Sequence, residues 1–246
     1  MLARLRTFRF DWKLTLLTLM LLPLLLSLGF WQLRREDEKL AMQANWDARE
    51  RETPVALGML PVAGDLQYRQ VELSGTVDNE RIFLLDNRVH LGQAGYDVVV
   101  PVTTDDNQLV FVNRGWIAQG ASRQQLPVIA PIQGPVRLRG TVYVPVGEPF
   151  VLGGDVVAEG WPKVVQTLEP AAMAQQLGAG SLYFPYVIRL AEAAPGVLVR
   201  DWPVITTTPE KHRGYAVQWF AMTAMLLGLY LYYSIRGDKA AATRTD

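Results

Sequence analysis

The sequence predicts a membrane protein of the α+β class, in which two transmembrane helices enclose an exported, mainly antiparallel β domain with one or two short helices. Two observations predict the helices: residues 14–33 and 214–235 form runs of 20 and 22 residues without a charged side chain. At about 1.5 Å per residue, each run makes a helix of roughly 30 Å, the thickness of the hydrocarbon core of a bilayer. A third observation predicts the β domain: between the runs, segments of alternating apolar and polar residues are separated by turn-forming residues.

The first apolar run, residues 14–33, is expected to remain in the membrane rather than to be cleaved as a signal peptide. A basic segment precedes it, and residues 27–29 resemble a small-residue cleavage site, as in a secretory signal. The run is long, however, and continues through Phe30 and Trp31 without a break, which favours a membrane span. Pro23 lies near its middle and is expected to kink the helix.

The second run, residues 214–235, has aromatic side chains at both ends, a pattern typical of the membrane–water interface. Basic residues lie on the outer side of each run: Arg4, Arg6, Arg9 and Lys13 before the first, and Arg236, Lys239 and Arg244 after the second. Because basic flanks stay on the cytoplasmic side, we expect residues 1–13 and 236–246 to be cytoplasmic segments. Residues 34–213 then form a periplasmic domain, and the protein is expected in the inner (plasma) membrane of a bacterium.

The exported segment is expected to begin with a helix and to continue as strands. Residues 36–51 are rich in helix-forming residues and extend the first helix as far as Thr53 and Pro54, because the residue before a proline avoids the helical conformation. Strand patterns follow at residues 68–77, 81–86, 95–102, 108–116, 136–144, 163–168 and 183–190, and one short helical pattern at residues 169–178. Short strands with little helix indicate a barrel or a sandwich, and the two alternatives stay open.

The composition argues against several classes of function. The 24 basic and 24 acidic residues balance, which argues against a nucleic-acid-binding protein. The chain has no cysteine, which excludes disulfides, cysteine metal sites and covalent c-type haem attachment, and it has only two histidines, His90 and His212. No catalytic motif is present, and His90 lies in a loop pattern without an identifiable partner. We therefore expect that the protein is not an enzyme.

The segment VNRGW, residues 112–116, ends an apolar strand with an arginine, a glycine and a tryptophan. One interpretation is that Arg114 and Trp116 project together onto a partner surface, where they hold an anion or a ring. The other is that Gly115 forms a β-bulge and Trp116 packs in the core. Composition alone favours the second interpretation, because bulges and buried aromatic residues are common.

His212 lies two residues before the second apolar run, where that helix meets the periplasmic face of the membrane. A neutral imidazole there can ligate a metal, and histidine is the usual axial ligand of haem iron; no metal site other than haem iron is expected. The propionates of a haem would meet the basic residues at the two periplasmic span ends, which are Arg34, Arg35, Lys211 and Arg213. The alternative is an interfacial histidine that contacts lipid headgroups.

Seven fragments, in their order along the chain, resemble the surfeit-locus family. They are GFWQLRREDEK (29–39), YRQVELSG (68–75), LLDNR (84–88), GYDVVVPV (95–102), VNRGW (112–116), EPF (148–150) and HRGYAVQWF (212–220). Each fragment is short, but the ordered set, with an apolar run at each end, is specific and covers nearly the whole chain.

The resemblance implies a function. Members of this family are membrane proteins that help to assemble haem–copper terminal oxidases of the respiratory chain, such as cytochrome c oxidase. The expected role is that of a chaperone-like assembly factor, which works with other assembly factors to stabilise the oxidase catalytic subunit while haem a is inserted, with transient binding of haem a. The family's haem-ligating histidine falls on His212. The alternative is a membrane-anchored scaffold that binds oxidase subunits without binding haem.

Overall fold

The structure of the chain is a computed structural model that describes residues 10–61, 64–120, 125–145, 160–180 and 182–236. Most of both expected cytoplasmic segments, and the fragment at residues 148–150, lie outside the described residues. The chain divides into two compact units. The first combines residues 1–44 with residues 204–246, and the second consists of residues 45–203.

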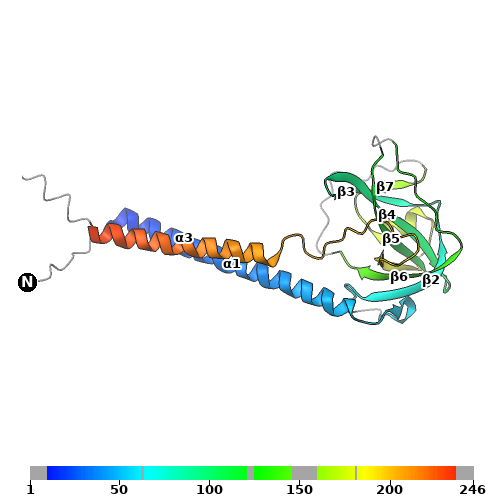
Figure 1. The fold of residues 1–246 in the computed structure, drawn as a ribbon, viewed down its shortest axis with the longest axis horizontal. Coiled ribbons are helices and arrows are strands. Elements are labelled where there is room, and N and C mark those ends of the chain that lie inside the picture. Colours follow the sequence, from blue (N-terminus) through cyan, green and yellow to red (C-terminus); the bar gives the residue numbers. More distant parts are fainter. Residues whose placement is uncertain (1–9, 62–63, 121–124, 146–159, 181, 237–246) are drawn as a thin grey trace, which may run out of the picture. The chain divides into compact units, whose positions relative to one another are not determined.

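The first unit is a pair of helices that lie side by side (Figure 1), namely α1 (Trp12–Glu50) as far as residue 44 and α3 (Pro209–Arg236); the end of α1 after residue 44 belongs to the second unit. The expected first span and the helical lead-in at residues 36–51 belong to one continuous helix of 39 residues, and Pro23 lies inside it. Both helices are long and apolar enough to cross a membrane, as judged by length and composition. The prediction of an apolar helix near each end of the chain is confirmed.

Aromatic side chains and one glycine form the contact between α1 and α3. Gly29 faces the ring of Phe220 so closely that an added Cβ would lie 2.6 Å from a ring carbon. Phe30 packs edge-on against the same ring, with the centroids 5.3 Å apart. Thr15 and Tyr230 share a hydrogen bond of 3.1 Å between their hydroxyl oxygens. The close approach of the two helices at Phe220 therefore requires a residue without a side chain, as at many helix contacts in membranes.

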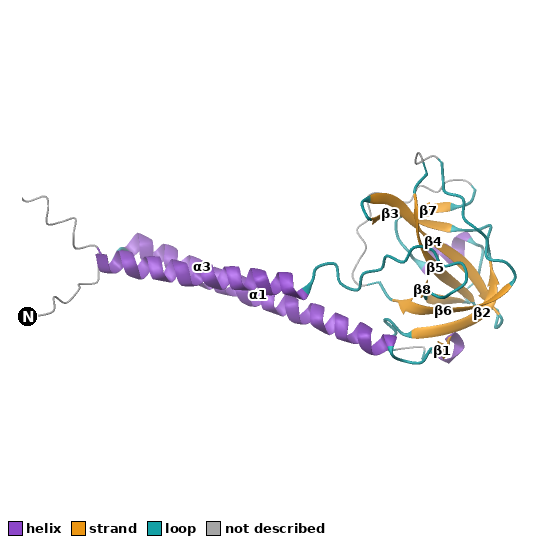
Figure 2. Cartoon of the chain, in the orientation of Figure 1, coloured by secondary structure: helices purple, strands orange, loops and turns teal. Residues whose placement is uncertain are grey.

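The second unit is a β domain (Figure 2). Its strands are β1 (Val55–Ala56), β2 (Gln70–Val77), β3 (Phe83–His90), β4 (Gln93–Thr104), β5 (Leu109–Ala118), β6 (Pro135–Tyr143), β7 (Lys163–Val165) and β8 (Tyr183–Leu190). Strands β2 to β8 lie where the alternating patterns predicted them, and α2 (Pro170–Gln176) lies where the short helix was expected. The two-residue strand β1 and the 3-10 turn at Leu57–Met59 were not predicted, because both are too short to show a periodicity.

Five of these strands close into a barrel. Around the ring, β2 pairs with β6, β6 with β8, β8 with β5, β5 with β4, and β4 pairs again with β2. At the last of these pairings Gly75 lies opposite Thr104, and a Cβ at Gly75 would collide with the backbone carbonyl of Thr103. Glycine is thus required where the two backbones approach each other. Of the two predicted alternatives, the structure is the barrel.

The sheet is mixed, although most of its pairings are antiparallel as expected. Three pairings are parallel, namely β1–β2, β3–β7 and β5–β8. Strands β7 and β8 do not pair with each other; each lies beside a strand of its own direction, β3 and β5, which flank the antiparallel strand β4. Side-chain alternation shows which face of a strand is buried, but it carries no information on the direction of the neighbouring strand. The parallel pairings therefore had no signal in the sequence.

Apolar side chains fill the barrel and also cover part of its outer face. Buried residues of the interior cluster include Val71, Val98, Val112, Leu138 and Ile188. A second cluster packs outside the barrel beneath α2 and includes Phe83, Phe111 and Met173. Since both faces of β5 are covered, residues 110–116 are all buried and the alternation of exposure disappears along this strand.

Candidate functional site

His212 lies in the first turn of α3, and its imidazole contacts α1. Its Nδ1 lies 2.8 Å from Oε1 of Gln32, which is 180 residues away in the sequence. An amide oxygen only accepts hydrogen bonds, so Nδ1 carries the ring proton and the lone pair is on Nε2. Nε2 is buried and has no hydrogen-bond partner among the described residues. The contact with Gln32 thus selects the tautomer whose Nε2 can ligate a metal.

The chemistry of this nitrogen suits an axial ligand of haem iron, although Nε2 is covered by its surroundings. Ligation therefore requires neighbouring side chains to move. Within the described ranges, no group of three or more histidine, aspartate or glutamate side chains could hold a metal ion. A metal at His212 would need its other ligands from elsewhere, as the porphyrin nitrogens of a haem provide them.

The four basic residues expected near haem propionates differ in their partners. Nε of Arg213 lies 3.1 Å from Oε1 of Glu36, across the helix pair. Arg35 pairs at 2.6 Å with the carboxylate one turn further along α1. Among the residues that the structure describes, no ion pair involves Arg34 or Lys211. Arg34 and Lys211 are therefore the two cations of this set that are available to an added anion.

Arg114 and Trp116 are buried, which corrects the interpretation that places them together on a partner surface. Their side chains belong to residues that are 1% and 7% exposed. The pairing of β4 with β5 shifts register between Val98 and Val99, and Gly115 has φ 118°, so a β-bulge turns Arg114 toward the protein. The second interpretation, a bulge at Gly115 with a packed tryptophan, is confirmed.

The guanidinium of Arg114 forms hydrogen bonds with two loops. Nε donates to the carbonyl of Gly196 at 2.7 Å, and Nη1 donates to the carbonyl of Ala130 at 2.9 Å. The backbone carbonyl of Arg114 accepts a hydrogen bond of 2.7 Å from the N–H of Leu198. Burial lowers the pKa of Arg114, but a guanidinium stays protonated at physiological pH. Arg114 therefore holds the segment that leads from β8 toward α3.

His90 contacts the same segment between β8 and α3, at Asp201. It ends β3, and its Nδ1 lies 2.8 Å from Oδ2 of Asp201. Its ring lies 5.2 Å from that of Trp116, measured between centroids. The histidine expected in a loop without a partner thus lies at a strand end and makes a structural contact of the β domain.

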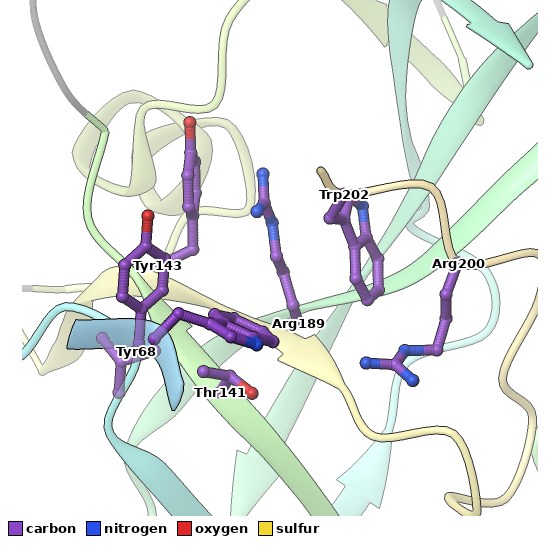
Figure 3. Close-up of a pocket in the computed structure, with 8 residues that line it drawn as sticks. Tyr68, Thr141, Tyr143, Arg189, Arg200 and Trp202 are labelled. Atoms are coloured by element: carbon purple, nitrogen blue, oxygen red, sulfur yellow. The ribbon is translucent and has the colours of Figure 1, made fainter. Parts of the chain in front are cut away.

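A third site, which the sequence did not predict, is a cavity of about 200 Å³ in the second unit (Figure 3). Its walls are mainly aromatic rings and arginines, contributed by Trp46, Tyr68, Tyr143, Arg189, Arg200 and Trp202. These residues come from the end of α1, the turn before β2, β6, β8 and the segment after β8, so no local motif unites them. The one available signal is Arg189 itself, a charged residue between two core positions of β8.

Arg189 lies at the centre of this cavity. Its guanidinium carbon is 3.6 Å from the centroid of the Tyr143 ring and 5.4 Å from that of Trp202. Arg200 lies on the opposite side of Trp202, at 5.7 Å from its centroid (Figure 3). Nε of Arg189 is buried without a hydrogen-bond partner among the described residues, and burial lowers the pKa of its guanidinium. Rings and cations thus alternate through the site.

Comparison with known proteins decides the family. The model of the SURF1 family matches residues 19–224, which include most of α1, the whole β domain and the first half of α3. The chain belongs to the SURF1 family. It is 25% identical over 231 residues to a SURF1-like protein of Rickettsia felis, a match that covers 90% of this chain and 96% of the relative.

Eukaryotic members are similar over the same extent. The chain is 26% identical over 238 residues to surfeit locus protein 1 of Homo sapiens, covering 89% of this chain and 77% of the relative. With surfeit locus protein 1 of Xenopus tropicalis it shares 26% identity over 241 residues, covering 89% of this chain and 75% of the relative. The resemblance to the surfeit-locus family seen in the sequence is confirmed, and the SURF1 family match includes His212, Arg114 and Arg189.

Proposed function

We propose that this protein is an assembly factor for a haem–copper terminal oxidase, which assists the insertion of haem a into the catalytic subunit by holding haem transiently at His212. Membership of the SURF1 family supports the proposal through the role that the surfeit-locus resemblance implies. The structural observation that carries the haem contact is the buried Nε2 of His212, which has no partner among the described residues. The partners would be the membrane, the oxidase catalytic subunit and other assembly factors, with neither catalysis nor nucleic-acid binding.

The residues around His212 have distinct tasks in this proposal. His212 would hold the haem, whose iron would accept its imidazole nitrogen as a ligand. Gln32 accepts the Nδ1 proton and keeps the lone pair on Nε2. Arg34 and Lys211 offer positive charge to the propionates. A single histidine that must first be uncovered binds haem less tightly than a preformed pair of ligands does. Weak binding suits a carrier that releases its haem.

The test is the visible spectrum of the full-length protein purified in detergent from cells that make haem a. His212→Ala should remove the Soret band and leave the protein folded in the membrane, because the proposed axial nitrogen is lost. His90→Ala is the matched control and should leave the band unchanged, because His90 is paired with Asp201 in the other unit. A wild-type protein without haem when haem a synthesis is raised, or a His212→Ala variant with as much haem as wild type, contradicts the haem contact.

The covered position of Nε2 favours a second candidate function. In this alternative the protein is a membrane-anchored scaffold that binds oxidase subunits without binding haem, and the hydrogen bond from His212 to Gln32 serves only to join α1 to α3. Oxidase subunits should then co-purify with the protein without pigment. His212→Ala should leave the amount of co-purified subunits unchanged if the helix pair stays intact.

We also propose that both termini are cytoplasmic and that residues 34–213 are periplasmic, in the inner membrane of a bacterium. Two helices of sufficient length and apolarity support a membrane location. The relative from Rickettsia felis supports a bacterial setting. The basic residues on the outer flanks of both apolar runs support the orientation.

A further inference from the structure

We propose that the cavity around Arg189 is a binding site for a small organic anion, namely a carboxylate attached to a flat apolar ring. The site lies within the second unit, which contributes every residue of its lining. It is therefore independent of the haem contact at His212, and either proposal can fail without the other.

The charge of the cavity favours an anion. The guanidinium of Arg189 is held between the faces of two rings, and its buried Nε has no acceptor among the described residues. The carboxylate of Asp97 acts on Arg189 electrostatically but is already engaged. Its Oδ2 accepts hydrogen bonds from Asn113 at 3.1 Å and from the indole N–H of Trp202 at 3.4 Å. An anion that enters the cavity thus meets a buried cation in need of an acceptor, where hydrogen bonds to charge are strong.

A second cation reinforces the first. Nη1 of Arg200 lies 3.7 Å from a carboxylate oxygen of Glu192, whose side chain is 92% exposed. Such an exposed and long ion pair contributes little, because water and salt screen it. Arg200 can therefore exchange this partner for an anion in the cavity. Two guanidinium groups on either side of Trp202 make the cavity selective for negative charge.

The shape of the cavity favours a flat ligand. Because Tyr143 and Trp202 occupy the two faces of the Arg189 guanidinium, its N–H groups point outward in the plane between the rings (Figure 3). A carboxylate that accepts two of these N–H groups lies in the same plane. The group attached to the carboxylate then continues between aromatic walls, where a flat apolar ring gains the most contact. The geometry selects an aryl carboxylate over a branched or bulky acid.

The backbone of one wall of the cavity has an unusual conformation. Tyr68 has φ 64°, in the left-handed region that an aromatic residue rarely adopts. In this conformation its N–H donates to the carbonyl of Val142 at 3.0 Å, and its ring packs edge-on against Trp46 with centroids 5.1 Å apart. Non-glycine residues in this region carry strain, and such strain concentrates at ligand-binding sites. The strained turn lines this cavity with Tyr68.

The size of the cavity argues for a small molecule. Its volume of about 200 Å³ is below that of sites for drug-sized ligands. A one- or two-ring acid is of the right order, whereas a peptide segment or a second protein would contact only the rim. We therefore take a small aryl carboxylate as the occupant.

The test is calorimetric titration of the full-length protein in detergent at low salt with 2-naphthoate and, as the neutral probe of equal shape, 2-naphthamide. Wild type should bind the acid at least about tenfold more tightly than the amide, since only the acid carries the negative charge that strengthens its hydrogen bonds to the two cations. Arg189→Gln should remove most of this preference for the acid. Tyr143→Leu should weaken the binding of both probes. Arg137→Gln, the control, removes an exposed arginine that pairs with Glu72 and is not among the residues that line this cavity, so this variant should bind both probes as wild type does.

Three results would overturn the proposal. They are equal affinity of wild type for acid and amide, no binding of either probe, and an unchanged preference in a folded Arg189→Gln variant. If Arg189→Gln does not fold, as judged by its circular dichroism melt, Arg200→Gln takes its place. Arg200 lies at the rim with a third of its side chain exposed, so its replacement should keep the fold and reduce the preference for the acid severalfold. The comparison of the two probes on wild type needs no variant at all.

Discussion

Replacement of Arg114 by alanine is expected to destabilise the β domain strongly. The change removes two hydrogen bonds from a charged donor, to the carbonyls of Gly196 and Ala130. Each such bond contributes about 1.5 kcal/mol or more, and the space left by a side chain of a residue only 1% exposed adds roughly 1 kcal/mol. Relief of the buried charge offsets part of this loss, and water can reach the freed carbonyls at the exposed residues Gly196 and Ala130. We expect a net loss of about 3 kcal/mol.

The assay is thermal unfolding of the full-length protein in detergent, followed by circular dichroism in the strand region. For a domain of this size, 1 kcal/mol corresponds to roughly 2–4 °C, so Tm should fall by about 10 °C. The Tm of the Arg114→Lys variant should fall less, because its ammonium group can still reach one of the two carbonyls. The control Arg137→Ala removes an arginine whose side chain is 73% exposed and should lower Tm by less than about 2 °C.

An Arg114→Ala variant that melts within about 2 °C of Arg137→Ala would refute this reasoning. The two loops would then be held without the guanidinium, and the burial of Arg114 would need another explanation. A reduced yield of assembled oxidase with an unchanged melt would return Arg114 to the role of a partner-binding residue.

Three further predictions concern the closing seam of the barrel, which is the pairing of β2 with β4, the turn at Asp78 and the membrane topology. Gly75→Ala should lower Tm by several degrees, since its Cβ would overlap the backbone of β4 and overpacking costs about 1–3 kcal/mol; a melt equal to wild type would contradict the closed seam. Partial burial raises the pKa of Asp78, but backbone and side-chain hydrogen bonds from Arg81 outweigh this effect and lower it. The stabilising contribution of Asp78 is therefore present above about pH 4 and is lost at more acidic pH. The difference in Tm between wild type and Asp78→Asn should shrink below about pH 4 and stay constant around neutral pH. A reporter active only in the periplasm should be active when inserted near Gln119 and silent after Asp246, and the opposite pattern would reverse the proposed orientation.

Much of the secondary structure was predictable because its signals are local. A charge-free run of bilayer length predicts a helix wherever it occurs, and alternation with turn residues predicts strands such as β2 and β8. The bulge at Gly115 was predictable for the same reason, since an internal glycine in a strand favours it. The helix from Trp12 to Glu50 likewise follows from an apolar run of bilayer length, with Pro23 inside it, and from the helix-forming residues after this run, which end before Pro54.

The sites were less predictable because they join distant parts of the chain. The sequence singled out His212, but not Gln32, which selects its tautomer from 180 residues away. It placed Arg114 at a strand end without showing that loops from residues 130 and 196 cover it. Nothing local marks Tyr143, Arg189 and Trp202 as neighbours, since the contacts among them exist only once β6, β8 and the following segment have packed.

The sequence by itself thus determined the two apolar helices, the order of the strands and the family to which the chain belongs. Only the tertiary structure decided that the strands close into a mixed barrel, that Arg114 is buried and that Arg189 lies between two rings. The physical reason is that side-chain periodicity reports the environment of each face of a segment, whereas pairing direction and ring closure depend on which distant segment supplies the neighbour.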